Sequence, residues 1–434
     1  MERYSLQTLE KWKNKTGRKP LIIQGARQVG KTWLLKEFGR RYYEKVAYVN
    51  FDNNKNMEIL FSKGMEISQL LQGLELETEI KITPNDTLII FDEIQENPNA
   101  LNSLKYFYEN APEYHIVAAG SLLGVALTHQ GKSFPVGKVE FMDLYPMSFY
   151  EFLDALGEDK LCSVLKQQNF ALMETFKAKY EDLLKTYFYV GGMPEAVKKF
   201  AEHQDFQEVR ELQNFLLKSY EQDFSKHIEK KDTPKVQMIW DSIPSQLAKP
   251  NPKFVYGLLK EGTRAKEFEN ALIWLKKTGL VYQINKLKKP GLPIYAYEDR
   301  SSFKLYMLDI GLFCAKSLLD AKTLLSGSRI FEEFKGSLTE QYVLQELKTL
   351  SDMPITYWEG TNSEVDFVVQ RGSEIIPVEV KATTNLKAKS LKVYCEKYQP
   401  AQAVRTSLAD FKKTEILTDI PLYVIENFDK IINQ

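Results

Sequence analysis

The first 150 residues alternate short apolar runs with longer amphipathic stretches, as a parallel sheet covered by helices requires. The apolar runs predict four strands, at Pro20–Gln24, Val46–Phe51, Thr87–Phe91 and His115–Ala119. Helical periodicity lies between these strands, for example at Lys31–Tyr43 and Ala100–Asn110. The pattern therefore predicts an α/β domain over residues 1–150.

Residues 151–230 have helical periodicity and predict a helical extension of that domain. The periodicity breaks at Tyr189-Val-Gly-Gly-Met-Pro194, where two glycines and a proline indicate a turn. A linker is predicted at Lys230–Lys235, because the order of elements changes beyond it.

Residues 231–325 predict helices followed by two strands, the order of a winged helix-turn-helix. The last helix is predicted at Lys266–Thr278 and ends at Gly279. The strands are predicted at Leu280–Asn285 and Ile294–Glu298, with a wing between them.

The last segment, residues 326–434, predicts another α/β domain. Its first helix is expected at Phe334–Leu350. The elements that follow are strands at Ile355–Glu359, Glu364–Gln370 and Glu374–Lys381, a helix at Ser390–Tyr398, and strands near Ala403–Ser407 and Pro421–Ile425.

Composition narrows the class of protein. Hydrophobic residues make up 44% and charged residues 27% of the 434, which is typical of a folded globular chain. The 58 Lys and Arg balance the 58 Asp and Glu, so any surface that attracts nucleic acid must be local. The scattered Cys162, Cys314 and Cys395 exclude a disulfide framework and a zinc ribbon. Without a signal peptide or an apolar run long enough to span a bilayer, the sequence predicts a cytoplasmic protein with no membrane partner.

A phosphate-binding loop follows the first predicted strand and opens a helix. The residues that satisfy its pattern G-x-x-x-x-G-K-[ST] are Gly25, Ala26, Arg27, Gln28, Val29, Gly30, Lys31 and Thr32. The two glycines let successive backbone N–H groups face one anion at the positive end of the helix dipole. We expect Lys31 to reach the β- and γ-phosphates of ATP and Thr32 to bind Mg²⁺.

Two carboxylates follow the apolar run of the third predicted strand, Thr87-Leu-Ile-Ile-Phe-Asp92-Glu93. We expect Asp92 to hold Mg²⁺ and Glu93 to polarise the attacking water, which favours ATP hydrolysis over binding alone. The fourth strand leads to Ser121. Two roles stay open for this serine: a hydrogen bond to the γ-phosphate or the attacking water, and the N-cap of the next helix.

These motifs resemble an AAA-like P-loop ATPase family of prokaryotes whose members carry a C-terminal domain of unassigned function. The resemblance rests on Gly-Ala-Arg-Gln-Val-Gly-Lys-Thr, Phe-Asp-Glu-Ile-Gln, Ala-Gly-Ser-Leu-Leu-Gly, Val-Gly-Lys-Val-Glu, Leu-Tyr-Pro-Met-Ser-Phe-Tyr-Glu-Phe and Tyr-Val-Gly-Gly-Met-Pro-Glu-Ala. It implies an ATPase and allows homo-oligomers, since an arginine finger in trans requires a neighbouring subunit.

This chain departs from the family pattern at one position, because relatives usually have Gly-Arg-Val where this chain has Gly137-Lys138-Val139. Lysine lacks the planar fork of arginine, so hydrolysis is expected to be slow if Lys138 supplies the transition-state cation. Arg27 is the other candidate for that cation, and its alternative is a solvated loop side chain.

The predicted winged helix offers two kinds of surface. Lys286, Lys288 and Lys289 lie on the wing, where lysines can contact DNA phosphates. Glu267 and Glu269 lie on the recognition helix, where they oppose DNA binding and favour a protein–protein contact. DNA and a protein partner therefore both stay open.

The C-terminal segment contains a carboxylate–lysine pattern. Asp366 begins one strand, and Glu379 and Lys381 end the next, with the spacing D-x(12)-E-x-K. An antiparallel pair places Glu379 and Lys381 on one face, within reach of Asp366. Two carboxylates and a lysine suit Mg²⁺-dependent phosphodiester cleavage, although such alternation is also common on half-exposed strands.

This pattern and the order of elements resemble the PD-(D/E)xK nuclease fold, which includes members without measurable cleavage. The resemblance implies that Glu340, on the preceding helix, supplies a further carboxylate. Residues 381–413 hold eight Lys or Arg against two Asp or Glu, which suits a nucleic-acid backbone.

The sequence thus predicts an α/β protein: a P-loop NTPase with a parallel sheet and flanking helices, then a winged helix and a restriction-endonuclease-like domain. The leading hypothesis is an ATP-hydrolysing switch that uses ATP and Mg²⁺ and acts on DNA or a protein partner. Two rivals stay open: an ATP-gated metal-dependent nuclease, and a nucleotide-controlled interaction scaffold.

Overall fold

The computed structural model describes residues 2–64, 66–121, 135–249, 251–326, 332–350, 353–384 and 386–433. Two units emerge from the pattern of contacts. The N-terminal unit is Glu2–Tyr145 with Lys277–Gly279, and the C-terminal unit is Pro146–Lys276 with Leu280–Gln434. No helix in these described stretches is long and apolar enough to cross a membrane. The predicted domain boundaries stay predictions.

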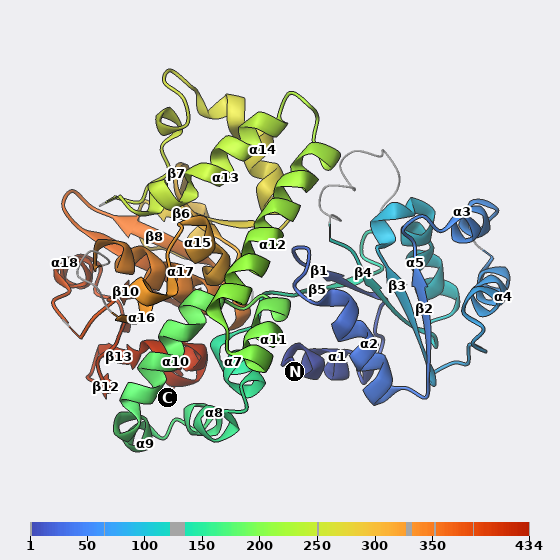
Figure 1. The fold of residues 1–434 in the computed structure, drawn as a ribbon, viewed down its shortest axis with the longest axis horizontal. Coiled ribbons are helices and arrows are strands. Elements are labelled where there is room, and N and C mark those ends of the chain that lie inside the picture. Colours follow the sequence, from blue (N-terminus) through green and yellow to red (C-terminus); the bar gives the residue numbers. More distant parts are fainter. Residues whose placement is uncertain are drawn as a thin grey trace. The chain divides into compact units, whose positions relative to one another are not determined.

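A five-stranded parallel sheet forms the centre of the N-terminal unit (Figure 1). Its strands are β1 (Leu21–Gln24), β2 (Lys45–Asn50), β3 (Thr87–Asp92), β4 (His115–Ala119) and β5 (Glu140–Asp143). They lie in the order β2-β3-β4-β1-β5, with every pair parallel. The parallel-sheet prediction is confirmed, and the four predicted strands are present. The sequence missed β5 because this short edge strand alternates exposed and half-buried residues instead of forming an apolar run.

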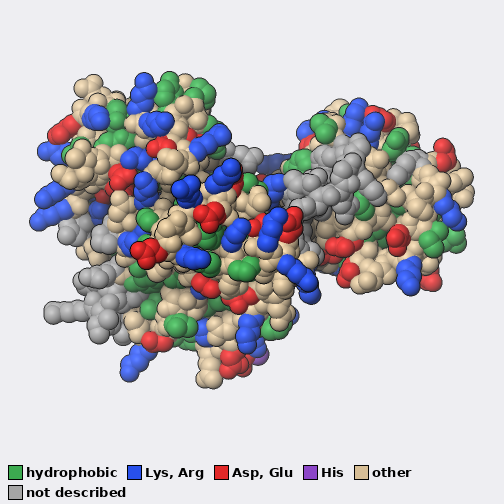
Figure 2. All heavy atoms as spheres, turned by 90° about the horizontal axis from the view of Figure 1, so that it is seen from above, with side chains coloured by type: hydrophobic (Ala, Val, Ile, Leu, Met, Phe, Trp, Pro, Cys, Tyr) green, Lys and Arg blue, Asp and Glu red, His purple; other side chains and the backbone are tan. Residues whose placement is uncertain are grey.

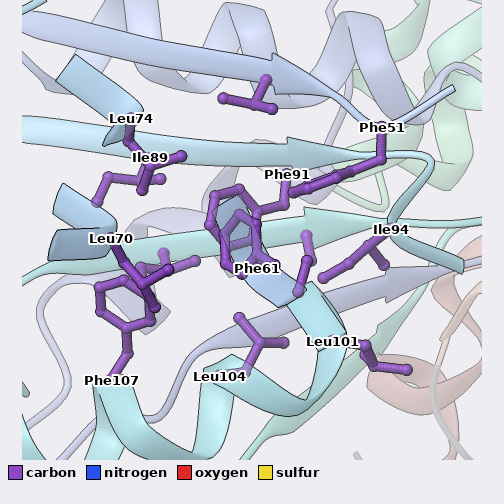
Figure 3. Packing of buried hydrophobic residues seen from close by; sticks show 14 of the residues in the cluster. Phe51, Phe61, Leu70, Leu74, Ile89, Phe91, Ile94, Leu101, Leu104 and Phe107 are labelled. Atoms are coloured by element: carbon purple, nitrogen blue, oxygen red, sulfur yellow. The ribbon is translucent and has the colours of Figure 1, made fainter. Parts of the chain in front are cut away.

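The helices that flank this sheet, within the described part of the unit, are α1 (Ser5–Lys13), α2 (Lys31–Tyr42), α3 (Lys55–Ser62), α4 (Ile67–Thr78) and α5 (Pro98–Asn110). The helices α3, α4 and α5 share one apolar core with the sheet (Figure 3). In that core the rings of Phe61 and Phe91 meet edge to face, with their centroids 5.9 Å apart. Because alternate strand residues face opposite sides, Leu88 instead lies towards Gly39 of α2.

The C-terminal unit combines a layer of helices with an eight-stranded mixed sheet. Its helices are α7 (Phe149–Ala155), α8 (Asp159–Lys166), α9 (Phe170–Thr175), α10 (Lys177–Val190), α11 (Pro194–His203), α12 (Phe206–His227), α13 (Thr233–Leu247), α14 (Ala265–Lys277), α15 (Ile310–Lys316), α16 (Ala321–Ser326), α17 (Glu332–Leu350), α18 (Lys389–Tyr398) and α19 (Phe428–Ile432). In Figure 1 the green helices α10 and α12 lie beside α15, which they contact.

The sheet of this unit joins two segments that the sequence assigned to different domains. Its strands are β6 (Val281–Leu287), β7 (Glu298–Met307), β8 (Ile355–Glu359), β9 (Glu364–Arg371), β10 (Glu374–Val380), β11 (Ala403–Ser407), β12 (Lys412–Lys413) and β13 (Leu417–Pro421). They lie in the order β12-β13-β11-β10-β9-β8-β6-β7. The antiparallel hairpin β6–β7 expected as a wing pairs with β8 through Lys286 and Leu287, and so continues the C-terminal sheet. The winged-helix assignment stays a prediction.

Two predicted strands are wrong. Ile294–Tyr297 is a 3-10 helix. The buried Ile294 belongs to the core that α18 also packs against, and its N–H donates to the side-chain oxygen Oε1 of Gln370 at 2.9 Å and not to the backbone of a neighbouring strand. The strand predicted at Pro421–Ile425 ends at Pro421, and the 3-10 helix Leu422–Asn427 follows. Residues 422–425 are all buried, so their apolar run did not distinguish a strand from a buried turn of helix.

The predicted turn at 189–194 is confirmed, since α10 ends at Val190 and α11 begins at Pro194. A Cβ atom on Gly192 would lie 2.1 Å from the carbonyl oxygen of Met147. The Gly192 N–H donates to Asp309 Oδ2 at 2.6 Å. This part of the family motif therefore has a packing role inside the C-terminal unit.

We expect Gly192→Ala to lower the free energy of unfolding by about 3 kcal/mol or more, since backbone atoms must move to admit the methyl group. Denaturation by urea measures the change. The matched control is Gly336→Ala within α17, where an added Cβ meets nothing within 4 Å and better helix propensity predicts a small gain. Equal stabilities of the two variants would contradict the packing role.

Candidate nucleotide site

The loop between β1 and α2 has the backbone that a phosphate cradle requires. Gly25 and Gly30 have φ angles of 146° and 93°, values that favour glycine. A Cβ atom on Gly25 would lie 2.3 Å from the carbonyl oxygen of Leu144. Gly30 then leads directly into α2 at Lys31, so the first N–H groups of the helix open onto the loop. This arrangement fits an anion of the phosphate class.

Lys31 lies folded against this loop. Its Nζ donates to the carbonyl oxygens of Gly25 at 2.9 Å and Ala26 at 2.7 Å, and the residue is only 7% exposed. Burial lowers the pKa of Lys31 to about 8, although the nearby Glu93 and Asp92 oppose this effect. The ammonium group is thus held at the mouth of the cradle by bonds that an incoming phosphate can replace.

This pKa predicts a pH dependence of ATP binding. The neutral amine prevails above pH 8 in the free protein, whereas bound phosphates require the ammonium form, so binding at high pH must take up a proton. We expect the affinity for ATP to fall roughly tenfold between pH 7 and pH 9, measured by titration calorimetry. Lys31→Arg, whose cation does not titrate in this range, should flatten the profile. A wild-type affinity independent of pH would contradict the assignment.

Asp92, at the end of β3, is 3% exposed and accepts hydrogen bonds from two neighbouring elements. Its Oδ2 accepts from Thr32 Oγ1 at 2.7 Å and from the Tyr48 hydroxyl on β2 at 2.9 Å. The two predicted metal ligands, Thr32 and Asp92, are therefore in direct contact. Their oxygens are the hard ligands that Mg²⁺ prefers, so the residues fit that ion.

Tyr48 was missed from the sequence, where it reads as one residue of an apolar strand. Parallel pairing places Tyr48 opposite Ile90, two residues before Asp92, and only this register brings its hydroxyl to the carboxylate. Tyr48 is therefore a positioning residue for Asp92.

We expect Tyr48→Phe to raise the Mg²⁺ concentration for half-maximal ATP hydrolysis about fivefold, the effect of one lost hydrogen bond of about 1 kcal/mol. The rate at saturating Mg²⁺ should change little, because the carboxylate itself remains. Magnesium titrations of the hydrolysis rate at fixed ATP test this. An unchanged magnesium requirement would contradict the positioning role.

Glu93 follows directly and has a left-handed backbone with φ of 50°. Its Oε2 accepts from Gln95 Nε2 at 2.6 Å and from Ser121 Oγ at 3.5 Å. Ser121 in turn accepts from Arg27 Nε of the phosphate loop at 3.3 Å. The strand β4, which ends just before Ser121, lies between β1 and β3, as the sensor role requires. The alternative N-cap role concerns residues after Ser121, which lie outside the described part of the chain.

Gln95 was not identified from the sequence. Its side-chain amide holds Glu93, while its Oε1 is buried without a hydrogen-bond partner among the described residues. Lys138 lies beside α5, where its Nζ pairs with Glu109 at 3.0 Å, and its role as a transition-state cation stays a prediction.

The C-terminal carboxylate–lysine pattern also converges in the structure. Val378 of β10 lies opposite Phe367 of β9, and Asp366 Oδ2 accepts the Val380 N–H at 2.7 Å. Lys381 Nζ pairs with Glu379 Oε1 at 2.5 Å. Burial raises the pKa of Asp366 well above its usual range, and two neighbouring carboxylates, those of Glu340 and Glu379, add to the effect.

Two charged residues in this cluster were missed. Lys304 on β7 is fully buried and forms ion pairs with Glu340, at 3.4 Å, and with Glu364. Glu364 precedes Asp366 by two residues on β9. Within the described ranges, no group of three or more His, Cys, Asp or Glu side chains is arranged to hold a metal ion. The metal and nuclease roles of Glu340, Asp366, Glu379 and Lys381 therefore remain predictions.

Comparison with protein families assigns a domain to the nucleotide site. Residues 17–153 match the family described as "AAA domain". Residues 181–323 and 335–425 match "Domain of unknown function (DUF8612)" and "Domain of unknown function (DUF4143)". No curated protein matches the chain. The N-terminal part is thus an AAA-type P-loop domain, and the nuclease-like character of the C-terminal part is unconfirmed.

Among solved structures, the chain resembles a Walker-type ATPase, PABY2304 of Pyrococcus abyssi, at 15% identity over 72% of this chain and 94% of that one, with a TM-score of 0.45. The Aeropyrum pernix ORC2 protein is 14% identical over 81% and 96%, with a TM-score of 0.35. The Thermotoga maritima RuvB Holliday junction branch migration motor is 11% identical over 65% and 89%, with a TM-score of 0.29. TM-scores this low establish no shared function.

Proposed function

We propose that this protein binds and hydrolyses ATP with the help of Mg²⁺, and that it works as a nucleotide-controlled switch. One observation carries the proposal: Lys31, Thr32, Asp92 and Glu93, predicted from separate motifs, lie around one phosphate loop inside an AAA domain. Each of these residues then has a chemical role.

The backbone N–H groups of the loop and Lys31 bind the phosphates, while Thr32 and Asp92 hold the metal ion. Bound Mg²⁺ would neutralise phosphate charge. Glu93 orients the attacking water and accepts its proton, after release from the Gln95 amide. Ser121 lies within reach of Glu93, which suits the sensor role. Arg27, from the same loop, is our candidate for a cation within the chain, and its hydrogen bond to Ser121 supports this role.

The target of the switch is DNA or a protein partner. On the face drawn in Figure 2, Lys and Arg side chains are interspersed with Asp and Glu, so no single-sign surface dominates it. The helix α14 exposes Lys266 and Lys277 together with Glu267 and Glu269, which favours a protein contact. The exposed Lys389, Lys392 and Lys397 of α18 instead favour a nucleic-acid backbone.

The test is the rate of ATP hydrolysis by the full chain with Mg²⁺, with and without duplex and branched DNA at low salt. Hydrolysis stimulated by DNA supports a switch that acts on nucleic acid, and hydrolysis indifferent to DNA supports a protein partner. Size-exclusion chromatography with and without ATP tests the homo-oligomer that a trans-acting finger requires. ATP bound without turnover would refute the hydrolase and leave the scaffold hypothesis.

The nuclease hypothesis has the convergence of Asp366, Glu379 and Lys381 in its favour. It requires Mg²⁺-dependent cleavage of DNA that Asp366→Ala abolishes.

A further inference from the structure

A partly buried cluster of carboxylates and ammonium groups lies where the β7, β9 and β10 strands meet α17. Its members are Lys304, Glu340, Glu364, Asp366, Glu379 and Lys381. A nuclease of the fold that the sequence resembles would need such carboxylates for a divalent metal ion. Whether they are available here depends on what they already bind.

Lys304 lies inside this cluster and comes from the hairpin, outside the predicted nuclease-like domain. Its side chain is 0% exposed, and its Nζ is paired with Glu364 Oε1 and lies 3.4 Å from Glu340 Oε2. The Tyr306 hydroxyl donates to the same Glu340 oxygen at 2.9 Å, and Lys304 Nζ lies 5.1 Å from the Tyr357 ring centroid. A buried ammonium with this many partners is a fixed part of the fold, because losing them would leave an unpaired buried charge.

Each of the remaining carboxylates has one oxygen that already binds a neighbouring group. Glu379 Oε1 pairs with Lys381, and Asp366 Oδ2 accepts the Val380 N–H. Glu379 Oε2 is buried and has no hydrogen-bond partner among the described residues. Mg²⁺ and Mn²⁺ sites are built from several oxygens, and no three carboxylates within the described ranges are arranged to hold a metal ion. The residues present therefore do not fit a divalent metal ion.

We propose that Lys304 is the resident cation of this cluster and takes over the charge-neutralising role that a metal ion has in nucleases of the fold. The cluster then ties the hairpin to the C-terminal sheet and does not cleave nucleic acid. This proposal is independent of the ATPase proposal, because the two sites share no residue.

The test measures Mn²⁺ binding to the full-length protein without nucleotide, by electron paramagnetic resonance, and compares each protein with its Asp366→Asn version. The difference isolates the cluster from the phosphate loop. At about 1 mM Mn²⁺, near the weakest affinity of protein sites for hard divalent ions, we expect the wild type and its Asp366→Asn version to bind the same amount of Mn²⁺. We expect Lys304→Met to gain about one Mn²⁺ per chain, lost again with Asp366→Asn.

Lys304→Arg is the matched control, since it keeps the cation and should bind no Mn²⁺. If Lys304→Met fails to fold, Lys304→Gln combined with Glu364→Gln removes both partners of one ion pair and leaves three carboxylates to form the site. Asp366-dependent Mn²⁺ binding by the wild type would overturn the proposal. So would a folded variant without the lysine that gains no Mn²⁺.

Discussion

Glu93→Gln is expected to lower the rate of ATP hydrolysis by roughly 100- to 1,000-fold, the range typical of a lost general base. The amide keeps the shape of the side chain but cannot take a proton from water. The affinity for ATP should stay within about twofold, because the phosphates are bound by the loop and Lys31 and not by Glu93. Phosphate release at saturating ATP measures the rate, and equilibrium titration measures the affinity.

The control for this substitution is Glu96→Gln, which removes the same charge three residues further along. Glu96 is exposed and accepts a long hydrogen bond, at 3.4 Å, from the Gln95 Nε2 that binds Glu93 at 2.6 Å. It should retain the wild-type rate. If Glu93→Gln also retained it, the water would have to be activated by another group, and the role of Glu93 would be wrong.

Lys31→Ala is expected to weaken ATP binding by about 10- to 100-fold, since a charge-assisted hydrogen bond to phosphate contributes about 1.5–3 kcal/mol. In the free protein Lys31 Nζ donates to two carbonyl oxygens of the loop, so its removal should cost the fold little. Calorimetric titration with ATP and Mg²⁺ gives the affinity, and thermal unfolding without nucleotide confirms the fold.

Lys55→Ala is a suitable companion, because Lys55 is an exposed lysine at the start of α3 and is not a residue of the phosphate loop. It controls for the loss of one positive charge from the same unit. Wild-type affinity in a folded Lys31→Ala protein would show that the nucleotide site has been assigned to the wrong residues.

Local motifs made the nucleotide site predictable from the amino-acid sequence. The phosphate loop depends on two glycines, one lysine and one threonine within eight residues, and its strand and helix adjoin it in the sequence. Asp92 and Glu93 were predictable because a buried apolar strand that ends in two carboxylates has few other uses. The positions of Tyr48 and Gln95 were not predictable, because their roles depend on strand register and on the left-handed turn at Glu93.

The C-terminal half shows where local patterns stop being informative. Apolar runs at residues 294–298 and 421–425 predicted strands, yet 3-10 helices begin at Ile294 and Leu422. At residues 422–425, burial in a helical turn requires the same composition as burial in a strand. The hairpin β6–β7 was assigned to a winged helix because helices followed by two strands are the order of elements in that fold. In the structure, the outer edge of β6 pairs with β8. Backbone groups at a strand edge need partners, and no local pattern says which strand will supply them.

The sequence by itself determined the P-loop fold of the N-terminal part and predicted Lys31, Thr32, Asp92 and Glu93 as its site, because the motifs that contain them span only a few neighbouring positions. Only the tertiary structure decided the surroundings of Asp366 and Glu379, since the buried Lys304 that lies among the carboxylates comes from a strand more than fifty residues earlier. Electrostatic interactions act through space and not along the chain. A carboxylate pattern in the sequence therefore cannot reveal which cation the fold has placed beside it.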